Sequence, residues 1–113
     1  MHELSLMESV RDLVLEQAAA HGAERVTGIT LRIGTLAGVE PDALRFAHEV
    51  VWKGTLAEGA ALMIEEVQAE CWCQPCAAPF PADGGVCECP RCGAISRELR
   101  QGRELQLASL ELL

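Results

Sequence analysis

The stretch CWCQPCAAPFPADGGVCECPRCG, residues 71–93, decides how this chain folds, because it holds all six of its cysteines. Cys73 and Cys76 form one C-x2-C pair, and Cys89 and Cys92, followed by a glycine, form a second. Two such pairs supply four thiolates, the ligand set that suits tetrahedral Zn2+. We therefore predict a closed, structural zinc site, because four protein ligands leave no coordination position for a substrate.

The cysteines also allow roles besides zinc binding. Iron fits a four-thiolate cage as well, and a thioredoxin-like redox motif would use one pair and leave the second pair without a role. Cys71 and Cys87 each precede a pair by two residues. The residues favour spare thiols for both, although Cys71 could approach the ion if its flanks are extended. A disulfide framework is disfavoured because the sequence begins without an export signal, and we predict a cytoplasmic protein with reduced thiols.

Two amphipathic helices are predicted outside the cysteine-rich stretch. Residues 5–21 show helical spacing of apolar side chains, with a capping box from Ser5 to Glu8 and Gly22 as terminator. Residues 39–54 predict a second helix, in which Pro41 suits the first helical position and Gly54 closes the helix.

Three strands are predicted as well. Residues 25–34 alternate between apolar and polar side chains, and residues 61–70 and 103–113 predict two further strands. The alternation of the third strand slips near Ala108 and Ser109, which predicts a bulge there.

The order of these elements predicts an α+β fold. Two helices pack on a small three-stranded mixed sheet, and a zinc-ribbon-like module is inserted between the last two strands. We expect one domain from residues 1–70 and 99–113, and the module from residues 71–98. A module with so few apolar groups cannot hold itself together, and structural zinc supplies about 10–16 kcal/mol of apparent stability. We therefore expect it to be unfolded without the metal.

The amino terminus offers a second candidate metal site. The Met1 amine, the His2 amide and the His2 imidazole form two fused chelate rings around a cation, and Glu3 can add its amide or carboxylate. Such a planar donor set suits Ni2+ or Cu2+. On spacing alone, a histidine in second position more often has no metal role. His21 and His48 are predicted to be packed or solvated side chains.

Composition and motifs exclude several classes of function. The 113 residues carry a net charge of −8 and 4% aromatic residues, which disfavours binding to nucleic acid. No apolar segment is long enough to span a membrane. No phosphate-binding G-x-x-x-x-G-K-[ST] motif and no nucleophile–base pair is present, so we predict no enzyme. The rival interpretations are a zinc-ribbon nucleic-acid-binding module and a thiol oxidoreductase that uses Cys71 or Cys87.

The sequence resembles the HypA/HybF family of hydrogenase-maturation nickel metallochaperones over essentially its whole length. The resemblance rests on the start MHELSL, on HGAERVTGITLRIGTLAGVEPDAL, on ECWCQPC, and on CPRCG followed by GRELQLASLEL. It implies an α+β nickel-binding domain that carries a zinc-ribbon-like excursion. The resemblance also implies that Cys73, Cys76, Cys89 and Cys92 hold zinc.

For nickel, the resemblance implies that His2 is the essential ligand. The Met1 amine and the backbone or side chain of Glu3 would assist it, and Glu40 corresponds to an acidic residue that approaches the nickel in some relatives. Two partners are implied: the GTPase HypB and the precursor of a [NiFe]-hydrogenase large subunit. Urease maturation proteins are a further implied partner. We expect labile nickel binding that weakens as protons compete for the ligands, and near-permanent zinc.

Overall fold

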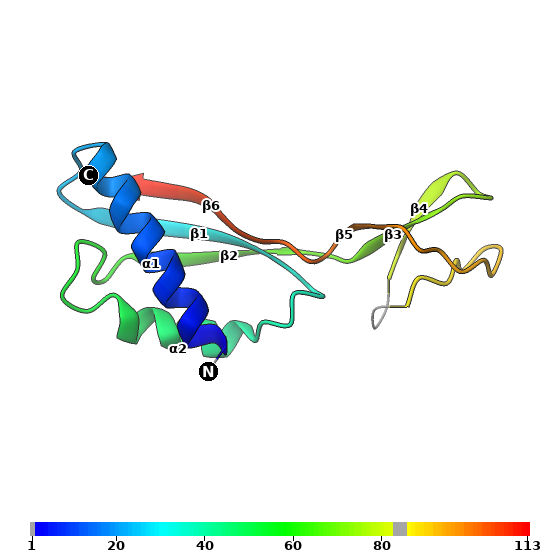
Figure 1. The fold of residues 1–113 in the computed structure, drawn as a ribbon, viewed down its shortest axis with the longest axis horizontal. Helices are drawn as coiled ribbons and strands as arrows, with labels where there is room; N and C mark the ends of the chain where they lie inside the picture. Colours follow the sequence, from blue (N-terminus) through cyan, green and yellow to red (C-terminus); the bar gives the residue numbers. More distant parts are fainter. Residues whose placement is uncertain (1, 83–85) are drawn as a thin grey trace. The chain divides into compact units, whose positions relative to one another are not determined.

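The computed structural model describes residues 2–82 and 86–113 and arranges them as two helices and six strands (Figure 1). The strands form two three-stranded sheets, ordered β2-β1-β6 and β4-β3-β5. The elements are α1 (His2–Ala20), β1 (Val26–Gly34), α2 (Pro41–Val51), β2 (Ala61–Val67), β3 (Glu70–Cys73), β4 (Ala78–Pro81), β5 (Leu99–Gln101) and β6 (Leu105–Leu112). The predicted α+β class is confirmed.

The chain divides into two compact units. The first comprises residues 1–31, 39–65 and 106–113, and the second comprises residues 32–38 and 66–105. The second unit contains β3, β4 and β5, whereas both helices belong to the first. In the described part of the chain, no helix combines the length and the apolarity needed to cross a lipid bilayer.

The first sheet is mixed, as predicted. β1 and β2 run in the same direction, and their carboxyl ends meet where the Thr35 amide donates to the Val67 carbonyl at 2.9 Å. Parallel neighbours need a crossover connection, which α2 supplies. β6 runs against β1, and the Leu113 amide donates to the Arg25 carbonyl at 2.8 Å.

The predicted bulge in the last strand, near Ala108 and Ser109, stays a prediction. At the other end of the β1–β6 pair, the Gly34 amide donates to the Glu104 carbonyl at 2.8 Å. This bond and the bond from Leu113 to Arg25 are separated by an odd number of residues on both strands. The hydrogen-bonded pairs of a regular antiparallel ladder recur at every second residue, so the pairing is not regular along its whole length. β6 is at the edge of the sheet, and its side chains are half-buried or exposed.

α1 begins three residues earlier than predicted. Ser5 lies inside the helix, so the predicted capping box with Glu8 is wrong. The end of α1 was predicted well. Gly22 has φ +63°, and the Ala23 amide donates to the Ala18 carbonyl at 2.9 Å. This is the left-handed termination that glycine favours at a helix end.

The core of the first unit contains apolar side chains of the two helices, which pack against each other, and of β1. His48, in the last turn of α2, is buried among these side chains, and its Nε2–H donates to the Ala60 carbonyl at 2.8 Å. His48 is therefore packed, as predicted. The other buried side chains described in this unit are Met7, Val14 and Ala18 of α1, Val26, Ile29 and Leu31 of β1, Leu44, Ala47, Val51 and Trp52 of α2 and its C-cap, and Ala57 and Ala60.

The predicted second strand, residues 61–70, is split between the two sheets. β2 ends at Val67, and β3 begins at Glu70 as the central strand of the second sheet. The Ala69 amide between them donates to Thr35 Oγ1 at 3.0 Å instead of to a strand neighbour.

Candidate metal centre

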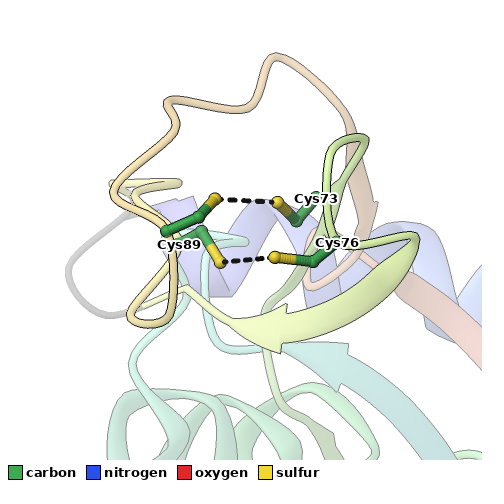
Figure 2. A group of neighbouring side chains, drawn as sticks. Cys73, Cys76 and Cys89 are labelled. Atoms are coloured by element: carbon green, nitrogen blue, oxygen red, sulfur yellow. Dashed lines mark hydrogen bonds between the residues drawn. The ribbon is translucent and has the colours of Figure 1, made fainter.

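Four cysteine side chains converge in the second unit. Cys73 ends β3 and Cys76 lies in the turn that leads to β4, while Cys89 and Cys92 come from the segment between β4 and β5. Figure 2 shows the sulfurs of Cys73, Cys76 and Cys89 directed into the same space. The structure thus brings together the four cysteines that the sequence predicted as a site.

The spacing of the four Sγ atoms suits a tetrahedral ion. All four lie within 4.8 Å of one another, with 3.5 Å between Cys73 and Cys92 and 4.0 Å between Cys76 and Cys89. With Zn–S bonds of about 2.3 Å, the sulfurs of a tetrahedral site lie ~3.8 Å apart. The donor set and its dimensions therefore fit Zn2+ without a rearrangement of the backbone.

The cluster is enclosed on one side and open on the other. Cys73 and Cys89 are buried, Cys76 is half-buried and Cys92 is exposed. The buried pair packs with Phe80 of β4 in the hydrophobic core of the second unit. Cys73 and Cys89 therefore also serve as core residues, at positions where a larger core would hold aliphatic side chains.

Backbone amides favour a thiolate at Cys89. The amides of Cys92 and Arg91 donate to its sulfur and lower the pKa of Cys89 to about 6, although burial acts in the opposite direction. The local turn that aims these amides is closed by the Gly93 amide, which donates to the Cys89 carbonyl at 2.9 Å. Gly93 has φ +74°, a left-handed conformation that suits glycine.

The thiols of the first pair hold their protons more tightly. Hydrogen bonds with the thiols of Cys92 and Cys73, together with burial, raise the pKa of Cys76 to about 12. At Cys73, the Cys76 amide lowers the pKa, but burial and the thiols of Cys92 and Cys89 outweigh it, so the net shift is upward. Binding a divalent cation here must therefore displace protons.

Cys71 and Cys87 form a disulfide, with their Cα atoms 5.8 Å apart. The prediction that both are spare thiols is wrong. Cys71 and Cys73 both lie on the buried face of β3, with one residue between them. Cys87 and Cys89 are likewise separated by one residue, which is exposed. When the two pairs converge, the residues two positions earlier converge too. The repeated C-x-C-x-x-C spacing was the signal that could have revealed this pairing.

The second predicted site lies at the start of α1. Met1 falls outside the described residues, and His2 is the exposed first residue of the helix. A Glu3 carboxylate oxygen accepts the Glu40 amide at 3.1 Å, and this hydrogen bond is the main cause that lowers the pKa of Glu3. Glu40 is the N-cap of α2. The structure thus brings Glu3 and Glu40 together, at the exposed beginnings of both helices.

Comparisons with known proteins agree with these features. Residues 1–112 match the family model described as hydrogenase/urease nickel incorporation, metallochaperone, hypA. Two proteins named hydrogenase maturation factor HypA are similar: that of Picosynechococcus sp. is 41% identical with 100% of both chains covered, and that of Azotobacter chroococcum is 44% identical with 99% of both covered.

Solved structures give the same result. The solution structure of the nickel metallochaperone HypA from Helicobacter pylori superimposes with a TM-score of 0.68 at 28% identity, covering 98% of this chain and 97% of that one. A second solution structure, of a protein named HypA, gives 0.72 at 29% identity, covering 100% and 97%.

Proposed function

Because this chain belongs to the HypA family of nickel metallochaperones, which act in hydrogenase maturation rather than as enzymes, we propose that it carries Ni2+ at its amino terminus. The nickel ligands are the Met1 amine, the backbone and imidazole of His2, and Glu3. The cargo is delivered to the precursor of the [NiFe]-hydrogenase large subunit.

The observation that carries this proposal is the position of His2 and Glu3 in the first turn of α1. The first four amides of a helix have no intrahelical acceptor, so a metal can take their nitrogens without breaking the helical hydrogen-bond ladder. His2 is exposed, which leaves its imidazole accessible to an ion from solution. Amine, amide and imidazole nitrogens in sequence suit the planar preference of Ni2+.

Glu3 has two ways to take part, and the geometry favours its backbone. Its carboxylate already accepts the Glu40 amide, and the lowered pKa means that this hydrogen bond favours the charged form. We propose that the Glu3 amide nitrogen is the fourth donor while the carboxylate holds the first turn against the start of α2. The exposed side chain of Glu40 is then a further oxygen donor from α2.

We propose that Cys73, Cys76, Cys89 and Cys92 hold Zn2+ as a structural ion. The support is the approach of all four Sγ atoms within 4.8 Å and the thiolate-favouring amides at Cys89. The bound ion supplies cross-linking and no chemistry. The protein residues of the cluster aim the sulfurs and exclude water from the buried pair.

The two sites suit two different tasks. A terminal site made of one side chain and backbone nitrogens releases its metal when protons compete for the amine and imidazole. A site of four thiolates, half of them buried, exchanges slowly. We propose that delivery occurs in the cytoplasm with a HypB-type GTPase as partner, because the sequence contains no nucleotide-binding motif of its own. Urease maturation proteins are a second proposed destination, in keeping with the family description.

One experiment tests the terminal site directly. A single alanine added before Met1 moves the amine away from His2 while leaving every side chain unchanged. We expect the extended protein to keep one zinc per chain by elemental analysis and to lose nickel binding in calorimetric titration. His2→Gln should lose nickel binding as well, whereas His21→Gln, at the opposite end of α1, is the matched control and should bind normally. If the extended protein binds nickel with wild-type affinity, the terminal chelate is wrong.

A further inference from the structure

We propose that Cys71 and Cys87 form a thiol modification site, which small disulfides oxidise to the cross-link seen in the structure. The pair is separate from the proposed nickel ligands and from the four-cysteine cluster. It is a second, redox-dependent cross-link in the unit that contains the cluster. We call the Cys71–Cys87 disulfide the staple.

The staple joins the two segments that present the metal ligands. Cys71 lies in β3, two residues before Cys73, and Cys87 lies two residues before Cys89. The Cα atoms of Cys71 and Cys87 are 5.8 Å apart, well inside the range of about 4.4–6.8 Å that a disulfide spans. The backbone therefore holds the pair ready to close without a movement of either segment.

Exposure assigns a different role to each cysteine. Cys71 is fully buried in the hydrophobic core of the second unit, whereas Cys87 is half-buried at its margin. A disulfide reagent from solution therefore reaches Cys87 first. Cys71 is the resolving thiol, because it contacts Cys87 but not the solvent.

The oxidant is a low-molecular-weight disulfide such as oxidised glutathione. The Cys87 thiolate attacks one of its sulfurs, which forms a mixed disulfide and releases one small thiolate. The Cys71 thiolate then attacks the Cys87 sulfur, and the second small thiolate leaves. The protons of Cys71 and Cys87 end on the two released thiols. One disulfide has been reduced and one has been formed.

The staple and the metal restrain the same part of the chain. The sequence separation of the two cysteines is 16 residues. In the chain-entropy model, closing a loop of this size shifts the folding equilibrium by roughly a hundredfold. With the staple formed, one restraint on the second unit remains when zinc leaves, and with the staple reduced, neither cross-link remains.

Mapping the disulfide tests the first half of the proposal. Zinc-loaded, reduced protein is incubated with oxidised glutathione, alkylated under denaturing conditions, and cut with a protease that cleaves before aspartate. Asp83 separates Cys71 from Cys87, so the staple links two peptides until it is reduced. We expect loss of two of the six free thiols, with a linked pair that disappears in Cys71→Ser and in Cys87→Ser. Six alkylated thiols, or a link that survives these substitutions, would overturn the assignment.

The second half needs only wild-type protein in its two redox states. Both are treated with excess zinc chelator and a protease, and cleavage within residues 66–105 is followed. We expect the oxidised protein to be cut more slowly than the reduced protein, by up to roughly a hundredfold. The Cys71→Ser/Cys87→Ser variant should be cut at the reduced rate with or without oxidant. Equal rates for oxidised and reduced wild-type protein would show that the staple does not restrain the unit.

Discussion

Glu3 connects the beginnings of both helices through a hydrogen bond of its side chain. Its carboxylate accepts the amide of Glu40, which is the N-cap of α2. The carboxylate also carries negative charge near the positive end of the α2 dipole, where it is stabilising. This contact lies in the part of α1 that precedes Ser5, the predicted start of the helix.

The pH dependence of this contact follows from the lowered pKa of Glu3. The Glu40 amide holds this pKa below its ordinary value of 4.5, so the carboxylate stabilises the folded state above that value. The contribution is lost as pH falls through the lower, folded-state pKa. Carbon NMR of the Glu3 carboxyl should show a midpoint below that of a peptide of residues 1–8, and the Glu40 amide proton should follow the same midpoint. Identical midpoints in protein and peptide would contradict the contact.

Among the sequence features used to predict individual site residues, the spacing of the cysteines was the most informative. The two C-x2-C pairs identified four residues whose sulfurs do lie within 4.8 Å of one another. The Cys71–Cys87 pairing was missed because we expected a reducing compartment, in which disulfides are disfavoured, whereas the register of the two segments decides this pairing. The contact of Glu3 with Glu40 joins residues far apart in sequence, and no local pattern predicts it.

Among the strands and their connections, three chain segments meet where β1 ends. The Gly34 amide donates to Glu104, and the Leu36 amide donates to the Gly102 carbonyl at 2.7 Å. A Cβ on Gly34 would lie 2.1 Å from the carbonyl carbon and oxygen of Gly102. The backbones approach so closely that only a hydrogen fits between them.

Gly34→Ala should therefore destabilise the protein. The added methyl must push two backbone segments apart, which lowers the free energy of unfolding by about 1–3 kcal/mol or more. Gly38→Ala is the control, because φ there is +74° but no atom lies within 4 Å of the added Cβ. Its cost should be limited to the strain of a left-handed alanine, about 1 kcal/mol. Midpoints of urea unfolding measure both, and a Gly38 variant as unstable as the Gly34 variant would refute the steric explanation.

Elements with strong local signals were predicted closely, and those set by tertiary contacts were not. β1 and α2 were found within a few residues, because alternation, a first-position proline and flanking glycines define them. The break between β2 and β3 was missed because apolar alternation continues through it. The bond from the Ala69 amide to Thr35 Oγ1 marks the point at which the pairing changes. β4 and β5 are short, and their sequences show no strand period.

For the molecule as a whole, the two units have different sources of stability. The first has an aliphatic core built from both helices and β1, whereas the core of the second consists largely of cysteines. The family and its general function were predictable, because sequence resemblance extends over nearly all residues. The division of the strands into two sheets was not, since it depends on which edges pair.

Removing zinc from the reduced protein should unfold the second unit and leave the first intact. The Trp72 amide of β3, which donates to the Glu98 carbonyl at 2.9 Å, should lose more than about a hundredfold of its hydrogen-exchange protection. The Leu31 and Ala47 amides, in β1 and α2, should keep theirs. Amide exchange followed by NMR, before and after chelation, measures both sets. Simultaneous loss of protection throughout the chain would mean that the units are not independent.

The position of β6 in the chain has a consequence for biosynthesis. β6 pairs with β1, but residues 70–101, which form the second sheet and carry every cysteine, are inserted before it. On the ribosome, therefore, the nascent β1 keeps one edge unpaired until the entire insertion has been translated. Both cysteine pairs emerge earlier, so metal capture and closure of the cysteine loop can precede completion of the first sheet.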